Sequence, residues 1–337
     1  MTKYNRVRLL ILIAAAASLP VFAGNLNRSP IASVATQAPP KSTAAAPEIQ
    51  LQKGSSVQTI PFVSKLIGKP LPYNVVLPVD YDQPSAKGTS YPVLYLLHGL
   101  TGHYDNWTTR TKLAQYAAAY PIIIVTPEGN NSWYTDSATV STDKYESYIV
   151  DELIPDVQQR FRVNPAREGR AIAGLSMGGY GALKFGVKHP QLFVFAGSMS
   201  GALGAASWTE ADMRGLQSIW QSLLLIYGPA DSPTRPANDL NKLFSELTPQ
   251  RIAVLPFIYL DCGTEDVLLQ NNRSFNEILL KQKIPHEYRE LPGKHNWEYW
   301  DAQVQEVLKL AARRMQWLTS LPGTVRGPAD KLKRERL

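Results

Sequence analysis

Cysteine is nearly absent from this chain of 337 residues, which contains only Cys262. One thiol cannot form an internal disulfide, so the fold must be stabilised by its hydrophobic core. The sequence also lacks a paired-cysteine zinc motif, a histidine-rich cluster and a glycine-rich phosphate loop. We therefore expect no metal and no organic cofactor.

Net positive charge is scarce everywhere except at the two ends of the chain. The net charge is +7, of which Lys3, Arg6 and Arg8 contribute +3 and the segment from Arg326 onward another +3, which leaves +1 for everything between. A nearly neutral body does not offer the basic face that binds phosphate backbones. We therefore expect no nucleic-acid partner.

The basic start is followed by the apolar stretch LLILIAAAASLPVFAGN, which is short for a membrane span. It ends with small residues where a signal peptidase requires them, up to Ala23. The pattern predicts a signal peptide over residues 1–23 and a protein that is exported to the periplasm or secreted. No stable membrane span is expected after cleavage; an uncleaved anchor is the alternative.

Two further segments have no hydrophobic periodicity. Residues 24–54 are rich in Ala, Pro, Ser and Thr, and residues 321–337 are basic. Both compositions predict disorder. The remaining residues, 55–320, are long enough to bury a sizeable core as one domain.

Strand and helix patterns alternate along residues 55–320. The pattern predicts strands at 73–77, 91–97, 122–125, 171–173, 193–200, 256–263 and 286–291. It predicts helices at 107–119, 144–161, 180–188, 267–282 and 297–318, the second introduced by Asp143 with Glu146 in the capping-box position. The alternation predicts an α/β fold with a mainly parallel central sheet and helices on both faces. In such folds the functional residues lie at the carboxyl ends of the strands.

The stretch GLSMG places Ser176 between Gly174 and Gly178, after an apolar run and before a helix. A nucleophile elbow holds its serine on a strained turn, where side chains two residues before and after it would collide. The two glycines meet that requirement. The structural alternative is a serine that merely caps a helix after a glycine-rich turn.

A serine nucleophile needs a base, and a base needs an orienting carboxylate. Of the five histidines, only His295 lies in a loop between the last expected strand and the last helix. Asp261, Glu265 and Asp266 follow the preceding strand; Asp266 lies in the connecting loop, where it could equally cap the next helix, and Glu265 is its nearest rival. The chain order Ser176, Asp266, His295 is the one expected of an α/β-hydrolase.

Five motifs occur in order along the chain: YLLHGLTGHYDNW, PEGNNSWYTDS, GLSMGGYGA, DCGTEDVLLQNNRSF and PGKHNWEYW. Together they resemble the putative-esterase family of α/β-hydrolases, which includes S-formylglutathione hydrolases, tributyrin esterases, feruloyl esterases and mycolyltransferases. The resemblance implies the α/β-hydrolase fold, with Ser176 as nucleophile, Asp266 as acid and His295 as base. It also implies that the backbone N–H groups of Leu100 and Met177 form the oxyanion hole.

The same resemblance places Trp133 and Tyr134 in the segment that lines the acyl or alcohol pocket. A packed aromatic pair beneath a loop is the alternative. Such folds carry a small lid or cap in an insertion, which here corresponds to about residues 200–248. We expect the choice of substrate to depend on this insertion.

These features favour a secreted serine carboxylesterase that acts on a small-molecule or glycan-linked ester through an acyl-enzyme. Short-chain or aromatic acyl groups are expected, because the insertion has no long apolar segment to line a deep tunnel, whereas Trp133, Tyr134, Trp208 and Trp220 could wall a shallow pocket. An acyltransferase that uses a sugar hydroxyl in place of water would need the same residues. The other alternative is a non-catalytic binding protein on a hydrolase scaffold.

Overall fold

The computed structural model describes residues 55–315. The predicted signal peptide (1–23), linker (24–54) and basic tail (321–337) lie outside these residues and stay predictions. No helix of residues 55–315 is both long enough and apolar enough to cross a membrane.

One sheet forms the centre of the described domain, with the strand order β1-β2-β4-β3-β5-β6-β7-β8. The strands are β1 (Ser56–Ile60), β2 (Tyr73–Leu77), β3 (Val93–Leu97), β4 (Ile123–Pro127), β5 (Arg170–Leu175), β6 (Phe195–Met199), β7 (Phe257–Gly263) and β8 (His286–Leu291). The pairs from β4 through β8 are parallel, whereas β1 with β2 and β2 with β4 are antiparallel. The predicted mainly parallel sheet is confirmed.

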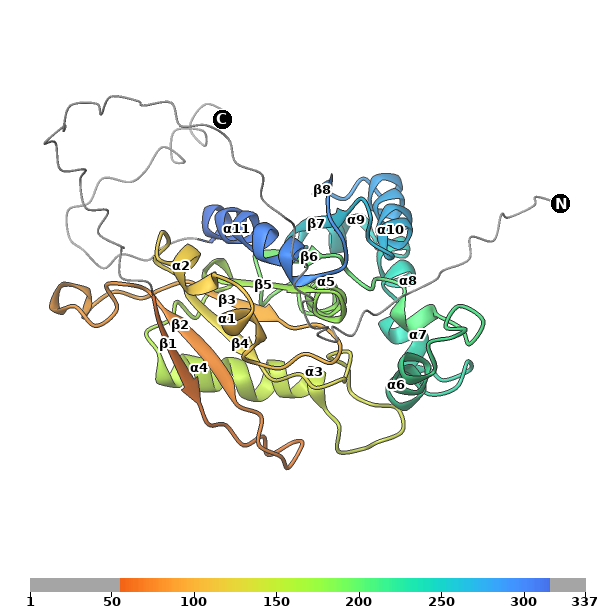
Figure 1. Cartoon of the computed structure of the whole chain (residues 1–337), viewed down its shortest axis with the longest axis horizontal. Coiled ribbons are helices and arrows are strands. Elements are labelled where there is room, and N and C mark those ends of the chain that lie inside the picture. Colours follow the sequence, from red (N-terminus) through yellow and green to blue (C-terminus); the bar gives the residue numbers. More distant parts are fainter. Residues whose placement is uncertain (1–54, 316–337) are drawn as a thin grey trace, which may run out of the picture. The chain divides into compact units, whose positions relative to one another are not determined.

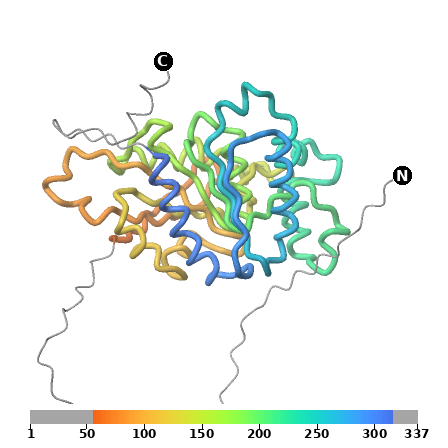
Figure 2. The backbone as a smooth tube through the Cα atoms, turned by 90° about the horizontal axis from the view of Figure 1, so that it is seen from above, coloured from red at the N-terminus to blue at the C-terminus, as the bar shows by residue number. Residues whose placement is uncertain are grey.

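Helices cover both faces of this sheet (Figure 1). They are α1 (Asn106–Thr109), α2 (Leu113–Ala117), α3 (Tyr145–Ser147), α4 (Ile154–Arg160), α5 (Met177–Lys188), α6 (Gln217–Tyr227), α7 (Thr234–Asn238), α8 (Leu240–Ser245), α9 (Pro249–Ala253), α10 (Leu269–Lys281) and α11 (Trp297–Arg314). One core packs α4, α5, α6 and α10 against the sheet, and a second packs α2 and α11 against the other face. Helix α11 lies against β5, β6 and β7 (Figure 2).

The predicted insertion at about residues 200–248 contains α6, α7 and α8. Helix α8 packs against both α5 and α10, so this part of the insertion belongs to the main body of the domain. Elsewhere in the insertion, the buried guanidinium of Arg235 links two segments. It donates to the carbonyls of Ala206 and Trp208 in one and of Gly228 and Pro229 in the other. A lid function for the insertion stays a prediction.

The prediction of one continuous helix at 107–119 is wrong. The segment forms two short helices, because α1 ends at Thr109 and α2 begins at Leu113. Two side chains satisfy the backbone at the break: the Thr111 hydroxyl donates to the carbonyl of Trp107, and the Lys112 amide donates to the Asp301 carboxylate at 2.7 Å. A partner so far along the chain leaves no local signal in the sequence.

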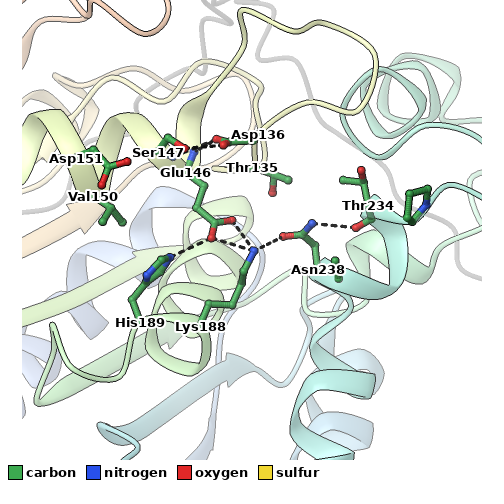
Figure 3. A pocket seen from close by; sticks show the side chains of 12 residues that line it. Thr135, Asp136, Glu146, Ser147, Val150, Asp151, Lys188, His189, Thr234 and Asn238 are labelled. Carbon is green, nitrogen blue, oxygen red and sulfur yellow. Dashed lines mark hydrogen bonds and ion pairs between the residues drawn. The ribbon is translucent and has the colours of Figure 1, made fainter.

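The capping box predicted for the helix at 144–161 is also wrong. This helical path consists of α3, a π-helical turn (Tyr148–Leu153) and α4. The second and third amides of α3, those of Glu146 and Ser147, donate to the carboxylate of Asp136 at 2.9 and 3.0 Å. The Glu146 side chain turns away from the backbone toward Lys188 and His189 (Figure 3).

Candidate active site

Ser176 occupies a sharp turn between β5 and α5. Its backbone is left-handed, with φ 52° and ψ −116°, and although it stands at the N-cap position its side chain makes no capping hydrogen bond. A Cβ on Gly174 would lie 2.5 Å from the carbonyl of Gly178, and a Cβ on Gly178 would lie 2.5 Å from the carbonyl oxygen of Leu97. The two glycines are therefore required by close backbone contacts, as a nucleophile elbow demands.

The three residues of the predicted triad meet at the carboxyl ends of three strands. Ser176 follows β5, Asp266 follows β7 and His295 follows β8. His295 Nε2 lies 3.0 Å from Ser176 Oγ, and His295 Nδ1 lies 2.9 and 3.1 Å from the two carboxylate oxygens of Asp266. This chain of contacts can carry a proton from the hydroxyl to the imidazole while the carboxylate stabilises the resulting charge.

The Asp266 carboxylate is fully buried at its side chain. Burial by itself raises its pKa, but the hydrogen bond and charge of His295, together with the Leu268 amide, outweigh that effect and lower the pKa. The Leu268 amide donates to Asp266 Oδ1 at 2.8 Å. Asp266 therefore holds both His295 and the Leu268 amide just before α10. It does not occupy the N-cap position of α10, which is Leu268.

The two rival carboxylates face elsewhere. Glu265 is exposed and forms an ion pair with Lys294 at 3.5 Å. Asp261 is fully buried within β7, where its carboxylate accepts a hydrogen bond from the Tyr299 hydroxyl at 2.9 Å. Burial raises the pKa of Asp261 to about 7.

Aromatic residues that the sequence analysis did not single out pack against the His295 imidazole. The Trp300 ring lies edge-on to the imidazole, with centroids 4.9 Å apart, and Trp297 lies edge-on to Trp300. The side chain of Asn296 caps α11 through the Tyr299 amide at 3.1 Å. A histidine directly before a capped, tryptophan-rich helix start was the available signal.

The two predicted oxyanion-hole residues flank Ser176. Met177 is the first residue of α5, and Leu100 follows Gly99, whose Cβ, if it had one, would lie 3.3 Å from Ser176 Cβ. Neither the Leu100 nor the Met177 amide has a hydrogen-bond acceptor within the part of the chain that the structure describes. Both are available to a carbonyl oxygen bound beside Ser176.

Trp133 and Tyr134 are both buried, with exposed fractions of 2% and 0%. Trp133 Nε1 donates to Ser222 Oγ at 3.0 Å, and its ring lies edge-on to Trp208. The Tyr134 hydroxyl donates to the carbonyl of His98 at 3.1 Å. These contacts fit the packed-pair alternative, and contact of either side chain with a substrate stays a prediction.

A separate cavity of about 380 Å³ lies away from the triad, between the α3 region, the end of α5 and α7 (Figure 3). It is lined by polar groups that bond to one another: Glu146 contacts Lys188 and His189, and Lys188 also donates to Asn238. Within residues 55–315 no group of three or more His, Cys, Asp or Glu side chains is arranged to bind a metal.

Comparisons with known proteins place this chain in a family. The family model described as "Putative esterase" matches residues 64–310. An acetyl esterase of Caldicellulosiruptor saccharolyticus is 29% identical over 272 residues, which cover 79% of this chain and 99% of that protein. A diacylglycerol acyltransferase/mycolyltransferase of Mycobacterium tuberculosis is 29% identical over 249 residues, covering 65% of this chain and 72% of that protein.

The solved structure of a ferulic acid esterase has a TM-score of 0.65 and 29% identity, and the match covers 78% of this chain and 99% of that chain. The predicted resemblance and the predicted fold are confirmed by these matches. The chain therefore belongs to the "Putative esterase" family and is a carboxylesterase with the α/β-hydrolase fold.

Proposed function

We propose that this carboxylesterase hydrolyses short-chain or aromatic acyl esters through a triad of Ser176, His295 and Asp266. The observation that carries the proposal is the continuous path from Ser176 Oγ through the imidazole to a buried carboxylate, with contacts of 3.0 and 2.9 Å. The path begins on an elbow whose strained backbone exposes the hydroxyl beside two amides.

In the first half-reaction, Ser176 Oγ attacks the ester carbonyl while His295 Nε2 takes the hydroxyl proton. The amides of Leu100 and Met177 donate to the oxyanion of the tetrahedral intermediate. The alcohol leaves with the proton from His295, and the acyl group stays on Ser176. Water then attacks this acyl-enzyme with His295 again as base, which releases the acid and restores the hydroxyl. Asp266 stays ionised and stabilises the imidazolium in both halves.

The acyl preference rests on the sequence of the insertion and on the relatives. A deep acyl tunnel would gain about 0.8 kcal/mol for each additional buried methylene, so kcat/KM would rise with chain length. A shallow pocket cannot provide that gain. Two relatives are named as an acetyl esterase and a ferulic acid esterase, which agrees with small or flat acyl groups.

The test is kcat/KM for a series of p-nitrophenyl esters from acetate to palmitate. We expect a maximum between acetyl and butyryl, followed by a decline. Ser176→Ala, measured in parallel, should lose nearly all turnover at every chain length while it remains folded. A maximum at the long-chain end would contradict the proposed pocket and favour a lipid-handling enzyme.

Transfer of the acyl group to a sugar hydroxyl is the second candidate, and the similarity to a mycolyltransferase favours it. Transfer and hydrolysis share the acyl-enzyme and differ in what attacks it. Product analysis in water with and without an added polyol separates them. We expect free acid to remain the main product when the polyol is present; a new ester as the main product would identify a transferase.

We also propose that the protein is exported. The support is the sequence of residues 1–23, in which a basic start precedes an apolar stretch that ends in small residues. Mass spectrometry of protein from the periplasm or culture medium tests this. The expected N-terminus is Gly24, and recovery of an intact N-terminal segment from these fractions would support the uncleaved anchor.

A further inference from the structure

The direction of the Leu100 amide is determined by the carbonyl of the preceding residue. A trans peptide is planar, so the Gly99 C=O and the Leu100 N–H point in opposite directions from one rigid unit. The Gly99 oxygen contacts His98 Nδ1 at 2.8 Å and accepts the Gly102 amide at 3.0 Å. Any group that fixes this carbonyl therefore also aims the Leu100 donor.

The His98 imidazole is itself held in one orientation. It is fully buried, and its Nε2 accepts the Gly129 amide at 2.9 Å. Because Nε2 is an acceptor, Nδ1 carries the hydrogen and donates it to the Gly99 oxygen. The main chain of His98 must also stay in place for this contact to form.

Tyr134 holds that main chain. Its hydroxyl donates to the His98 carbonyl at 3.1 Å, and its ring fits between two glycines. A Cβ on Gly129 would lie 2.5 Å from the ring, and one on Gly181, in the helix that follows Ser176, would lie 2.8 Å from it. The ring is thus held between the loop after β4 and α5, with little freedom to move.

The backbone of Tyr134 is fixed from the other side by a buried lysine. Tyr134 has a left-handed φ of 50°, which is unfavourable unless the surroundings enforce it. Lys184 Nζ donates to the Tyr134 carbonyl at 2.5 Å and to Thr135 Oγ1 at 2.7 Å, and it forms an ion pair with Glu146 at 3.0 Å. Lys184 is fully buried on α5.

We propose that Tyr134 is a positioning residue of the oxyanion hole: its hydroxyl holds the His98 carbonyl and thereby aims the amide of Leu100. This inference rests on the proposed function, because it assigns Leu100 the role of an oxyanion donor. Tyr134 then acts beneath the loop without contacting the substrate, which accounts for its complete burial.

The test is Tyr134→Phe, which keeps the ring between the glycines and removes only the hydroxyl. Loss of an entire oxyanion donor costs about 10²–10³ in kcat, so a misaimed donor should cost about tenfold. We expect this decrease in kcat with KM changed less than about twofold. Binding of a trifluoromethyl ketone, which forms an oxyanion adduct on the serine, should weaken by a similar factor.

Tyr73→Phe is the matched control. Tyr73 lies on β2, away from the triad, and its buried hydroxyl donates to Asp156 at 2.6 Å. The substitution should lower the melting temperature without lowering kcat. If Tyr134→Phe also changes only the melting temperature while wild-type protein turns over esters, this inference fails and the proposed function stands. If wild-type protein shows neither turnover nor labelling of Ser176, both fail.

Discussion

Replacement of Asp266 by asparagine changes one atom and is expected to disable the base. The Leu268 amide, 2.8 Å from Oδ1, requires an acceptor there, so the new side chain keeps its oxygen at that position. Its NH₂ group then occupies the position of Oδ2, which lies 2.9 Å from His295 Nδ1. A donor at this position leaves a proton on Nδ1 with only the longer contact, 3.1 Å, to the Oδ1 oxygen, and so favours the tautomer with the proton on Nε2. In that tautomer Nε2 faces Ser176 Oγ at 3.0 Å and cannot accept the hydroxyl proton.

The size of the effect has two parts. The amide could flip to restore the tautomer only by leaving the Leu268 amide without an acceptor, which costs about 1–3 kcal/mol, or roughly one to two powers of ten in active molecules. Loss of the negative charge that stabilises the imidazolium adds the remainder. Together we expect kcat to decrease by about 10⁴, the scale known for this substitution in serine triads, or about 5.4 kcal/mol.

The assay is steady-state hydrolysis of p-nitrophenyl acetate, with circular dichroism to confirm folding. Glu265→Gln is the matched control, since its ion pair with Lys294 is exposed, and it should change kcat by less than about twofold. The reasoning is refuted if Glu265→Gln is the disabling change, or if Asp266→Asn retains more than about a tenth of wild-type kcat while folded.

Two stability predictions follow from buried charges. Because burial raises the pKa of Asp261 from 3.8 to about 7, its contribution to stability is complete below about pH 4 and is lost as the pH rises through about 7. Asp261→Asn should therefore raise the melting temperature relative to wild type more at about pH 8 than at about pH 5; an equal difference at both pH values would contradict this. Glu146→Gln removes the carboxylate beside the fully buried Lys184. Urea unfolding should show that the free energy of unfolding decreases by about 3–5 kcal/mol. A loss below about 1 kcal/mol would show that the pair is not needed to keep the ammonium buried.

The elbow was predictable because its requirement is local. Gly174 and Gly178 lie within two residues of Ser176, and the collisions that exclude larger side chains involve adjacent backbone. The parallel sheet was predictable for a related reason: buried strands such as β3 and β4 read as mainly apolar runs. The position of His295 after the last strand favoured it as the base, whereas the choice of Asp266 over Glu265 rested on the resemblance to the esterase family.

Features that depend on distant partners were not predictable from local patterns. The carboxylate that caps α3 belongs to Asp136, ten residues before Glu146. The prediction that the nearby Asp143 caps this helix is therefore wrong. The role of Tyr134 depends on His98 and Lys184, 36 and 50 residues away. An aromatic residue in a loop gives the same sequence signal whether it lines a pocket or lies beneath one.

The most direct test of the central claim is the site at which a fluorophosphonate reacts. The account predicts stoichiometric labelling on the peptide that contains Ser176, abolished by Ser176→Ala. Ser198 and Ser200, both buried near the end of β6, are internal controls and should stay unlabelled. A label on either of them, or labelling that persists in Ser176→Ala, would contradict the assignment of Ser176 as the nucleophile.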